Sequence, residues 1–353
     1  MSRFLNAKYR TLKPYAPGEQ PESAGIIKLN TNESPFPPCG GVVEAISSAE
    51  TERLNLYPDP DAKALIKALS DYHGAPACGI MAGNGSDELL AFSFMAFPGE
   101  NRKIYFPDIS YGFYEVYAEI FGADAHPVPL DENLSIRIED YYNLDGMIVI
   151  ANPNAQTGAA ISRNDIEKIL RTGNRDNLVL IDEAYVDFGA ESSLRLLDRY
   201  DNLLVIQTFS KSRNLAGARI GAAFASKGVI EDLSKIKYSF NSYNLSRLSI
   251  LAGVAAIEDT EYFKECTGEI KKTRAEFVNN MEALGFSVIP SLANFVLARH
   301  GGISGEAYYN ELRRRNILVR HFNSERIKDY VRITIGSRAD MDALIEATKA
   351  ILS

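Results

Sequence analysis

The sequence predicts an α/β protein with a large domain, built on a mainly parallel sheet between helices, and a smaller α+β domain at the C-terminal end. The first observation is length, since 353 residues exceed what one hydrophobic core usually supports. The second is the alternation of short apolar runs with helical patterns between residues 80 and 240, which is typical of a parallel sheet covered on both faces. The third is the change after Gly285, where short strands follow one another around two helices.

The N-terminal stretch, residues 1–30, is predicted to form an extended arm. It carries three prolines and a single pair of large aliphatic residues, Ile26–Ile27. A loop stiffened by prolines follows over residues 30–38. Apolar spacing then predicts helices over residues 41–49 and 62–73.

The large domain is predicted to span residues 31–245. Short apolar runs within it predict strands at 80–83, 103–106, 147–150, 178–181, 203–206 and 221–225. Helical spacing between and after these strands predicts helices at 89–97, 111–121, 162–170 and 229–240.

The small domain is predicted to span residues 246–353. A helical pattern over residues 245–284 predicts a long helix that connects the two domains. Strands are then predicted at 286–289, 295–298, 317–319 and 330–335, and helices at 304–315 and 339–352.

Composition narrows the class of protein. The net charge is −8 and no basic patch stands out, because the run Arg313–Arg315 fits a solvated helix face, so nucleic acid is not an expected partner. No stretch of about 18 apolar residues occurs, so no membrane partner is expected. Met1–Phe4 does not begin a signal peptide, and the three cysteines lack disulfide-framework or metal-ligand patterns. We expect a cytoplasmic protein without a metal.

Three charged residues follow or flank predicted strands. Lys211 lies just past the strand at 203–206, among small and hydroxyl residues, and Asp182 ends the strand at 178–181. Arg219 lies between small residues with no carboxylate nearby in the sequence, which favours an anionic partner such as phosphate. Open α/β sheets bind ligands outside the carboxyl ends of their strands. An amine, an acid and an arginine at this place match the aldehyde, the pyridine nitrogen and the phosphate of pyridoxal phosphate.

Asn84–Glu88, between a predicted strand and a predicted helix, has two interpretations. Its glycine and the N–H groups of the helix start suit a phosphate. Alternatively, Ser86 or Asp87 simply caps the helix.

The turn Asn152–Gly158 follows another strand of the same sheet and could place an amide against a ring hydroxyl. The phenol of Tyr185, three residues after Asp182, could make the same contact. Tyr111 could stack on a planar ring, although ordinary partial burial explains any one of 18 tyrosines equally well.

Arg332 stands inside an otherwise apolar strand. It must either face solvent on an edge strand or pair with an anion, because an unpaired buried charge is costly. Arg320 ends another short strand and could converge on the same place, which would favour an acidic group in the substrate.

The chain resembles the fold-type I aminotransferases that use pyridoxal phosphate, and within them it is most similar to the histidinol-phosphate aminotransferases. The resemblance extends over essentially the whole length and implies a seven-stranded sheet in the large domain. It rests on Leu12–Tyr15, Leu29–Pro35, Tyr57–Asp59, Gly83–Glu88, Asp182–Tyr185, Thr208–Ser212 and Val331–Gly336.

The resemblance implies a role for each candidate residue. Lys211 would bond to the cofactor aldehyde, Asp182 would pair with the pyridine N–H, and Tyr185 would contact the ring oxygen. The remaining cofactor contacts would come from Gly85, Ser86, Asp87, Ser210 and Arg219 at the phosphate, Tyr111 stacked on the ring, Asn154 at the ring oxygen, and Tyr57 reaching the phosphate of the partner subunit. The acidic end of the substrate would be held by Tyr15, Arg320 and Arg332. A homodimer with shared active sites is therefore expected.

The implied reaction transfers an amino group from histidinol phosphate to the 2-oxo acid 2-oxoglutarate. Threonine-phosphate decarboxylases and aromatic aminotransferases share the scaffold and remain alternatives. A regulator that keeps this fold as a sensor would carry an N-terminal DNA-binding module, for which an arm of about 30 residues is too short. The chain departs from the family at Gln156, where relatives often have proline, and at Ala155, where many have asparagine. Loss of that proline removes a φ restraint and predicts a looser turn.

Overall fold

The computed structural model describes residues 5–21, 25–98 and 103–353. Met1–Phe4, on which the exclusion of a signal peptide rests, lies outside the described residues. So do residues 22–24 of the predicted arm.

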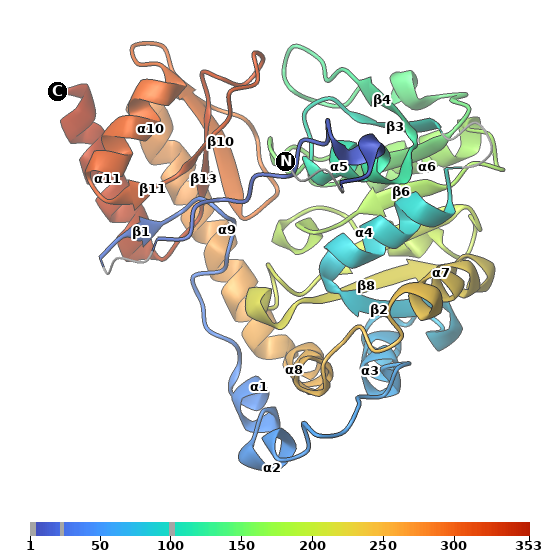
Figure 1. The fold of residues 1–353 in the computed structure, drawn as a ribbon. Coiled ribbons are helices and arrows are strands. Elements are labelled where there is room, and N and C mark those ends of the chain that lie inside the picture. Colours follow the sequence, from blue (N-terminus) through green and yellow to red (C-terminus); the bar gives the residue numbers. More distant parts are fainter. Residues whose placement is uncertain (1–4, 22–24, 99–102) are drawn as a thin grey trace.

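A seven-stranded sheet forms the centre of the larger part of the molecule (Figure 1). Its strands, in spatial order, are β2 (Ile80–Asn84), β8 (Ile220–Ala225), β7 (Leu203–Thr208), β6 (Val179–Asp182), β5 (Met147–Ala151), β3 (Lys103–Pro107) and β4 (Asp124–Val128). Every neighbouring pair is parallel except those that involve β8, which runs antiparallel to both β2 and β7. The predicted α/β class with a mainly parallel sheet is confirmed.

Strand β4 is the one strand of this sheet that the sequence did not predict. It lies at the edge, its side chains are mostly exposed or half-buried, and it contains Pro127. An edge strand needs no apolar alternation and tolerates proline on its open side, so neither usual signal was present.

Both faces of the sheet are buried. Successive residues of β7 alternate between two apolar clusters, with Leu204 and Ile206 in one and Leu203 and Val205 in the other. Because strand side chains point alternately to opposite faces, each cluster is the core on one side of the sheet.

Helices cover these faces and continue into the C-terminal part (Figure 1). They are α1 (Gly40–Ala45), α2 (Ser48–Thr51), α3 (Lys63–His73), α4 (Gly85–Ala96), α5 (Phe113–Phe121), α6 (Arg163–Thr172), α7 (Lys227–Phe240), α8 (Arg247–Glu258), α9 (Thr260–Ala283), α10 (Gly305–Arg314) and α11 (Arg338–Leu352). Short 3-10 turns occur at Ala7–Tyr9, Ala77–Gly79, Ile138–Tyr141, Val186–Phe188, Ser193–Leu196 and Ala216–Ala218.

Two predicted helices are each divided in the structure. The stretch 41–49 forms α1 and α2, and the stretch 245–284 forms α8 and α9. Asp259 begins the second helix of the latter pair, since its side chain accepts a hydrogen bond from the backbone N–H of Tyr262. An aspartate at this position stabilises a helix start, so the apolar pattern continues across a real break.

The C-terminal part contains a four-stranded antiparallel sheet in the order β12 (Arg320–His321), β13 (Val331–Thr334), β10 (Phe295–His300) and β9 (Phe286–Val288). Strand β1 (Ile27–Lys28), from the N-terminal segment, pairs in parallel with β11 (Ile317–Leu318). Because β13 lies between two strands, the interpretation of Arg332 as a solvent-facing residue of an edge strand is wrong.

No helix in the described ranges is both long and apolar enough to cross a bilayer.

The sheet core gives a stability test. Replacing the fully buried Leu204 with alanine should lower the free energy of unfolding by about 2–5 kcal/mol, because it removes a buried side chain and leaves a cavity. Leu292, which is 37% exposed, is the matched control, and Leu292→Ala should cost much less. Urea unfolding curves measure both, and equal losses would contradict the assignment of the core.

Candidate active site

One cavity of about 350 Å³ lies at the carboxyl ends of β5, β6 and β7, beside the N-terminal segment and β13. Its wall includes most of the candidate residues: Tyr15, Ser86, Asp87, Tyr111, Asp182, Tyr185, Ser210, Lys211, Arg219, Arg320 and Arg332. Parallel strands end at one edge of the sheet, so side chains that are far apart in the sequence meet there.

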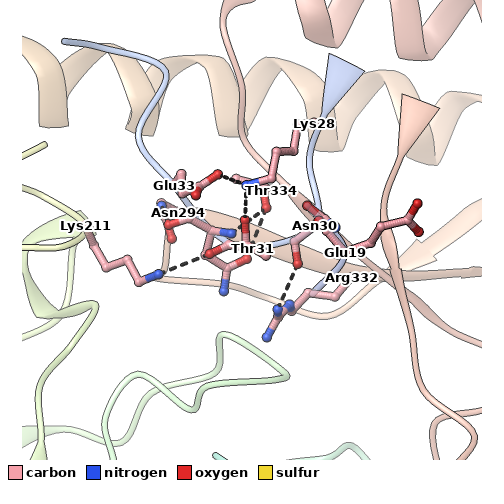
Figure 2. Close-up of polar contacts among 10 residues, drawn as sticks. Glu19, Lys28, Asn30, Thr31, Glu33, Lys211, Asn294, Arg332 and Thr334 are labelled. Carbon is pink, nitrogen blue, oxygen red and sulfur yellow. Dashed lines mark hydrogen bonds and ion pairs between the residues drawn. The ribbon is translucent and has the colours of Figure 1, made fainter. Parts of the chain in front are cut away.

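The side chain of Lys211 enters the cavity from the turn that follows β7. Its amine donates a hydrogen bond to the carbonyl oxygen of Thr31, at 3.1 Å (Figure 2). Burial lowers the pKa of Lys211 to about 8, and the nearby positive charge of Arg332 acts in the same direction. A neutral amine is the nucleophilic form, so this environment favours attack on a carbonyl carbon.

Asp182 is the last residue of β6 and is only 4% exposed. One carboxylate oxygen accepts a hydrogen bond from the hydroxyl of Tyr114, at 2.8 Å, and the other accepts one from the backbone N–H of Ala184, at 3.2 Å. Burial raises the pKa of Asp182 to about 6, while these two donors act in the opposite direction. The acid is therefore mostly ionised at pH 7, with oxygens that remain open to a further donor in the cavity.

The opposite end of the cavity suits a phosphate. Gly85 begins α4 with a φ of +76°, and a β-carbon there would lie 2.5 Å from a guanidinium nitrogen of Arg219. Only glycine permits this approach of the arginine to the helix start. The first N–H groups of a helix have no partner within the helix and attract anions, so together with Arg219 and Ser210 they form a donor set for phosphate.

Two details of this end differ from the sequence-based interpretation. Asn84 occupies the N-cap of α4 without a capping side-chain bond, so Ser86 and Asp87 do not cap the helix but lie in its first turn. Arg219 does have a carboxylate partner, because Asp87 accepts its hydrogen bond at 2.9 Å from 132 residues away. Asp87 also accepts from the hydroxyl of Tyr111, at 2.7 Å.

The hydroxyl of Tyr185 is held by a residue to which sequence reasoning gave no role. The side-chain amide of Asn32 donates to it at 3.0 Å. Asn32 is 1% exposed and is itself fixed by the C-terminal part, since Thr334 bonds to its backbone N–H and side-chain oxygen and Asn294 donates to its carbonyl. Figure 2 shows Asn294 and Thr334 beside the N-terminal segment that contains Asn30 and Thr31. The available signal was an asparagine in a loop that contains prolines a few residues later, which marks a turn but not its partner.

Asn154 is not among the residues that line the cavity. It is 2% exposed, its amide donates to the carbonyl of Ile109, and its oxygen accepts from the backbone N–H groups of Gln156 and Thr157. Ala155 and Gln156 line the cavity instead. The turn is well anchored despite the missing proline, because the side chain of Gln156 also donates to the carbonyl of Ser110, at 2.7 Å.

Two arginines on neighbouring strands line the cavity. Arg320 and Arg332 are directly opposite each other on β12 and β13. Arg332 donates to the carbonyl of Ala155, at 2.8 Å, and its buried Nε has no hydrogen-bond partner among residues 5–21, 25–98 and 103–353. Arg320 donates to the carbonyls of Ala16 and Pro17, and Tyr15 lines the same cavity. This wall therefore carries concentrated positive charge.

Tyr57 lies outside the cavity. It is 78% exposed and its ring stacks on that of Tyr243, with centroids 4.5 Å apart. Within the part of the chain that the structure describes, no cluster of three or more His, Cys, Asp or Glu side chains could hold a metal ion.

The comparisons with known proteins agree with this geometry. Residues 24–347 match the family described as aminotransferase class I and II, and the chain therefore belongs to this family of pyridoxal-phosphate enzymes. A histidinol-phosphate aminotransferase from Clostridium beijerinckii is 48% identical over 100% of this chain and 98% of its own. The corresponding protein from Brachyspira hyodysenteriae is 46% identical over 100% of this chain and 99% of its own.

Solved structures give the same picture of the fold. Histidinol-phosphate aminotransferase from Clostridium acetobutylicum has a TM-score of 0.84 at 27% identity, covering 93% of this chain and 99% of that chain. The Sinorhizobium meliloti enzyme in complex with pyridoxal-5'-phosphate has a TM-score of 0.82 at 24% identity, covering 92% of each chain. The donor set at α4, the buried acid and the buried amine of this chain fit that cofactor.

Burial of the Lys211 amine should lower the free energy of unfolding of the cofactor-free protein. At pH 7 the ammonium form of Lys211 is buried, so Lys211→Met should raise the free energy of unfolding by up to about 3 kcal/mol. The pKa of Lys211 is lower in the folded chain than in the unfolded one. The unfolded chain therefore binds more protons between pH 8 and 10.5, and wild-type stability should rise with pH in that window. Urea unfolding at pH 7 and pH 10 tests this, and an advantage of the variant that does not shrink with pH would contradict it.

Proposed function

We propose that this protein transfers the amino group of histidinol phosphate to 2-oxoglutarate, giving imidazole-acetol phosphate and glutamate. The observation that carries the substrate assignment is identity of 44–48% across the whole chain to proteins named histidinol-phosphate aminotransferase, from both Clostridium and Brachyspira. The assignment agrees with the chemistry of the cavity, because Arg320 and Arg332 in its wall suit a phosphate or a carboxylate.

Each end of the cavity has a distinct task in this proposal. Ser210, Arg219 and the first turn of α4 would hold the cofactor phosphate, and Asp182 would accept a hydrogen bond from the ring nitrogen. Tyr111 would lie against the ring, and Tyr185 would donate to the ring oxygen. Arg320, Arg332 and Tyr15 would hold the acidic end of each substrate in turn, with Arg332 well suited because its Nε has no partner.

When bound, pyridoxal phosphate supplies an aldehyde that bonds to an amine and a protonated ring that takes up electrons. Lys211 would first anchor the aldehyde and then, once displaced by the donor amine, take the proton from the substrate α-carbon and return it to the cofactor carbon that had carried the aldehyde. A pKa of about 8 suits this role, because a general base and acid works best when its pKa lies near the working pH. Asp182, as a carboxylate, would keep the ring nitrogen protonated.

Two alternatives use the same scaffold. A threonine-phosphate decarboxylase would also need the two arginines of the cavity wall. An aromatic aminotransferase would also need the amine of Lys211 and the carboxylate of Asp182. The structure of L-threonine-O-3-phosphate decarboxylase from Porphyromonas gingivalis resembles this chain, with a TM-score of 0.78, but at 22% identity the likeness concerns the fold alone.

A substrate screen of the purified protein with pyridoxal phosphate separates these functions. With 2-oxoglutarate present, kcat/KM for histidinol phosphate should exceed that for phenylalanine or tyrosine by on the order of 100-fold, because an unfilled polar subsite is costly. Glutamate formation and carbon dioxide release are both measured, with threonine phosphate as the fourth amine. Carbon dioxide released from threonine phosphate, without glutamate, would overturn the proposal in favour of decarboxylation. Lys211→Ala is the control and should lose both turnover and the absorbance of the lysine-linked cofactor.

We also infer that the chain works as a homodimer in the cytoplasm, with an arm (1–30), a cofactor domain (31–245) and a small domain (246–353). The support for a dimer is a group of large apolar side chains that are exposed in the single chain, among them Tyr57 at 78%, Phe240 at 70% and Leu54 at 56%. Exposed apolar side chains mark a protein interface where they form a contiguous patch, so burial of these three in a dimer is part of the inference.

A complementation experiment tests whether Tyr57 completes the site of the partner subunit. Tyr57→Ala should weaken cofactor binding about tenfold or more, because one hydrogen bond to a charged phosphate is lost. Mixing this variant with Lys211→Ala should form heterodimers in which one of two sites has both native residues. At a cofactor concentration too low to saturate Tyr57→Ala, the activity of the mixture should exceed the sum of the activities of its two components measured separately, whereas a simply additive mixture would argue against shared sites.

A further inference from the structure

One buried contact of Asp182 has no role in the function proposed above. The hydroxyl of Tyr114 donates to the carboxylate of Asp182 at 2.8 Å, and Tyr114 is fully buried in the first turns of α5. Tyr111 lies three residues earlier, and the two rings meet edge to face with centroids 5.8 Å apart. This short segment thus places Tyr111 on the cavity wall and Tyr114 against the carboxylate of Asp182.

Tyr114 can only donate in this contact. Burial, and then the charge of Asp182, raise the pKa of the Tyr114 hydroxyl well above its usual range, so it stays protonated. A buried phenol beside a carboxylate supplies a hydrogen bond to the charged form and opposes protonation of the acid.

The surroundings of Asp182 leave few other sources of stabilisation. Within the described ranges no arginine, lysine or histidine forms an ion pair with it. The other titratable groups that interact with it are Asp87 of α4, Tyr117 of α5 and Tyr185. Lys211 lies on the wall of the same cavity. Asp87 acts against ionisation, and the backbone N–H of Ala184 is the only other donor to the carboxylate among the described residues.

We propose that Tyr114 is a positioning residue, which keeps Asp182 ionised and fixes one of its oxygens so that the other side of the carboxylate faces the cavity. The inference rests on the proposed role of Asp182 but not on which amine is the donor. It predicts that Tyr114 affects the reaction only through the acid.

The first test measures the acid itself. Aspartate labelled with ¹³C at the side-chain carboxyl is titrated by NMR in the full-length, cofactor-free protein, with Asp182→Asn to assign the signal. Asp182 should titrate near pH 6 in the wild type, and about one pH unit or more higher in Tyr114→Phe, because a hydrogen bond to the charged form is lost. An unchanged titration would overturn the proposal even if the protein proved to be an efficient aminotransferase.

The second test uses the cofactor-loaded enzyme. The acid limb of the kcat profile should move to higher pH in Tyr114→Phe, so that activity falls several-fold near pH 6 and recovers at pH 8. Cofactor affinity, followed by absorbance, should weaken in the same acidic range. In an Asp182→Asn background, Tyr114→Phe should have no further effect on kcat. Two results would overturn the proposal: a loss of kcat in Tyr114→Phe that is equal at every pH, or a full additional loss of kcat when Tyr114→Phe is combined with Asp182→Asn.

The control is another buried tyrosine. Tyr308 is 1% exposed and its hydroxyl bonds to Thr348, at 2.6 Å, far from the cavity in the C-terminal part. Tyr308→Phe should lose stability as Tyr114→Phe does, as measured by urea unfolding, yet leave the pKa of Asp182 and the pH profile unchanged. A shift of the profile in Tyr308→Phe would mean that any buried hydroxyl has this effect, and would remove the case for Tyr114.

Discussion

The site depends on placing a buried amine, Lys211, and a buried carboxylate, Asp182, on the wall of one cavity without pairing them. Lys211 donates a hydrogen bond to the carbonyl of Thr31. Asp182 accepts hydrogen bonds from the hydroxyl of Tyr114 and the backbone N–H of Ala184, so the hydrogen-bond partners of both groups are neutral. A direct ion pair would satisfy both charges and leave nothing for a ligand. Because the partners are neutral, burial shifts both pKa values toward neutrality, and a molecule with complementary groups can stabilise both charges when it binds.

The N-terminal segment connects these groups to the C-terminal sheet. The carbonyl of Thr31 holds Lys211 (Figure 2), and the neighbouring Asn32 bonds to Thr334 of β13. Arg332, on the same strand as Thr334, donates to the carbonyl of Ala155. The N-terminal segment at Thr31 and Asn32 therefore contacts the amine of Lys211 on one side and the four-stranded sheet on the other. Placement of the C-terminal part is coupled to the cavity through hydrogen bonds, and the site does not belong to the large sheet alone.

Local signals made the fold and the centre of the site predictable. Apolar runs mark β5, β6 and β7 because these strands are buried on both faces, and the residues that follow them, such as Lys211, meet at one rim by sheet geometry. Contacts between distant segments were not predictable from such signals. Tyr114 meets Asp182 across 68 residues, and Asn32 meets Tyr185 across 153. Nothing in the pattern of either segment specifies its partner, because a buried tyrosine or a turn asparagine fits many environments.

The single reversed strand decides where the anion site can be. Since β8 runs against β7, its first residue lies beside the end of β7, and Thr208 is paired with Gly221. Arg219, immediately before β8, thus lies at the same edge of the sheet as Lys211, and both belong to the connection 209–219 between the two strands. Had β8 run parallel, its start would lie at the opposite edge, roughly 20 Å away for a strand of this length. This topology therefore holds the guanidinium of Arg219 and the amine of Lys211 at one edge of the sheet, where a single bound molecule can contact both.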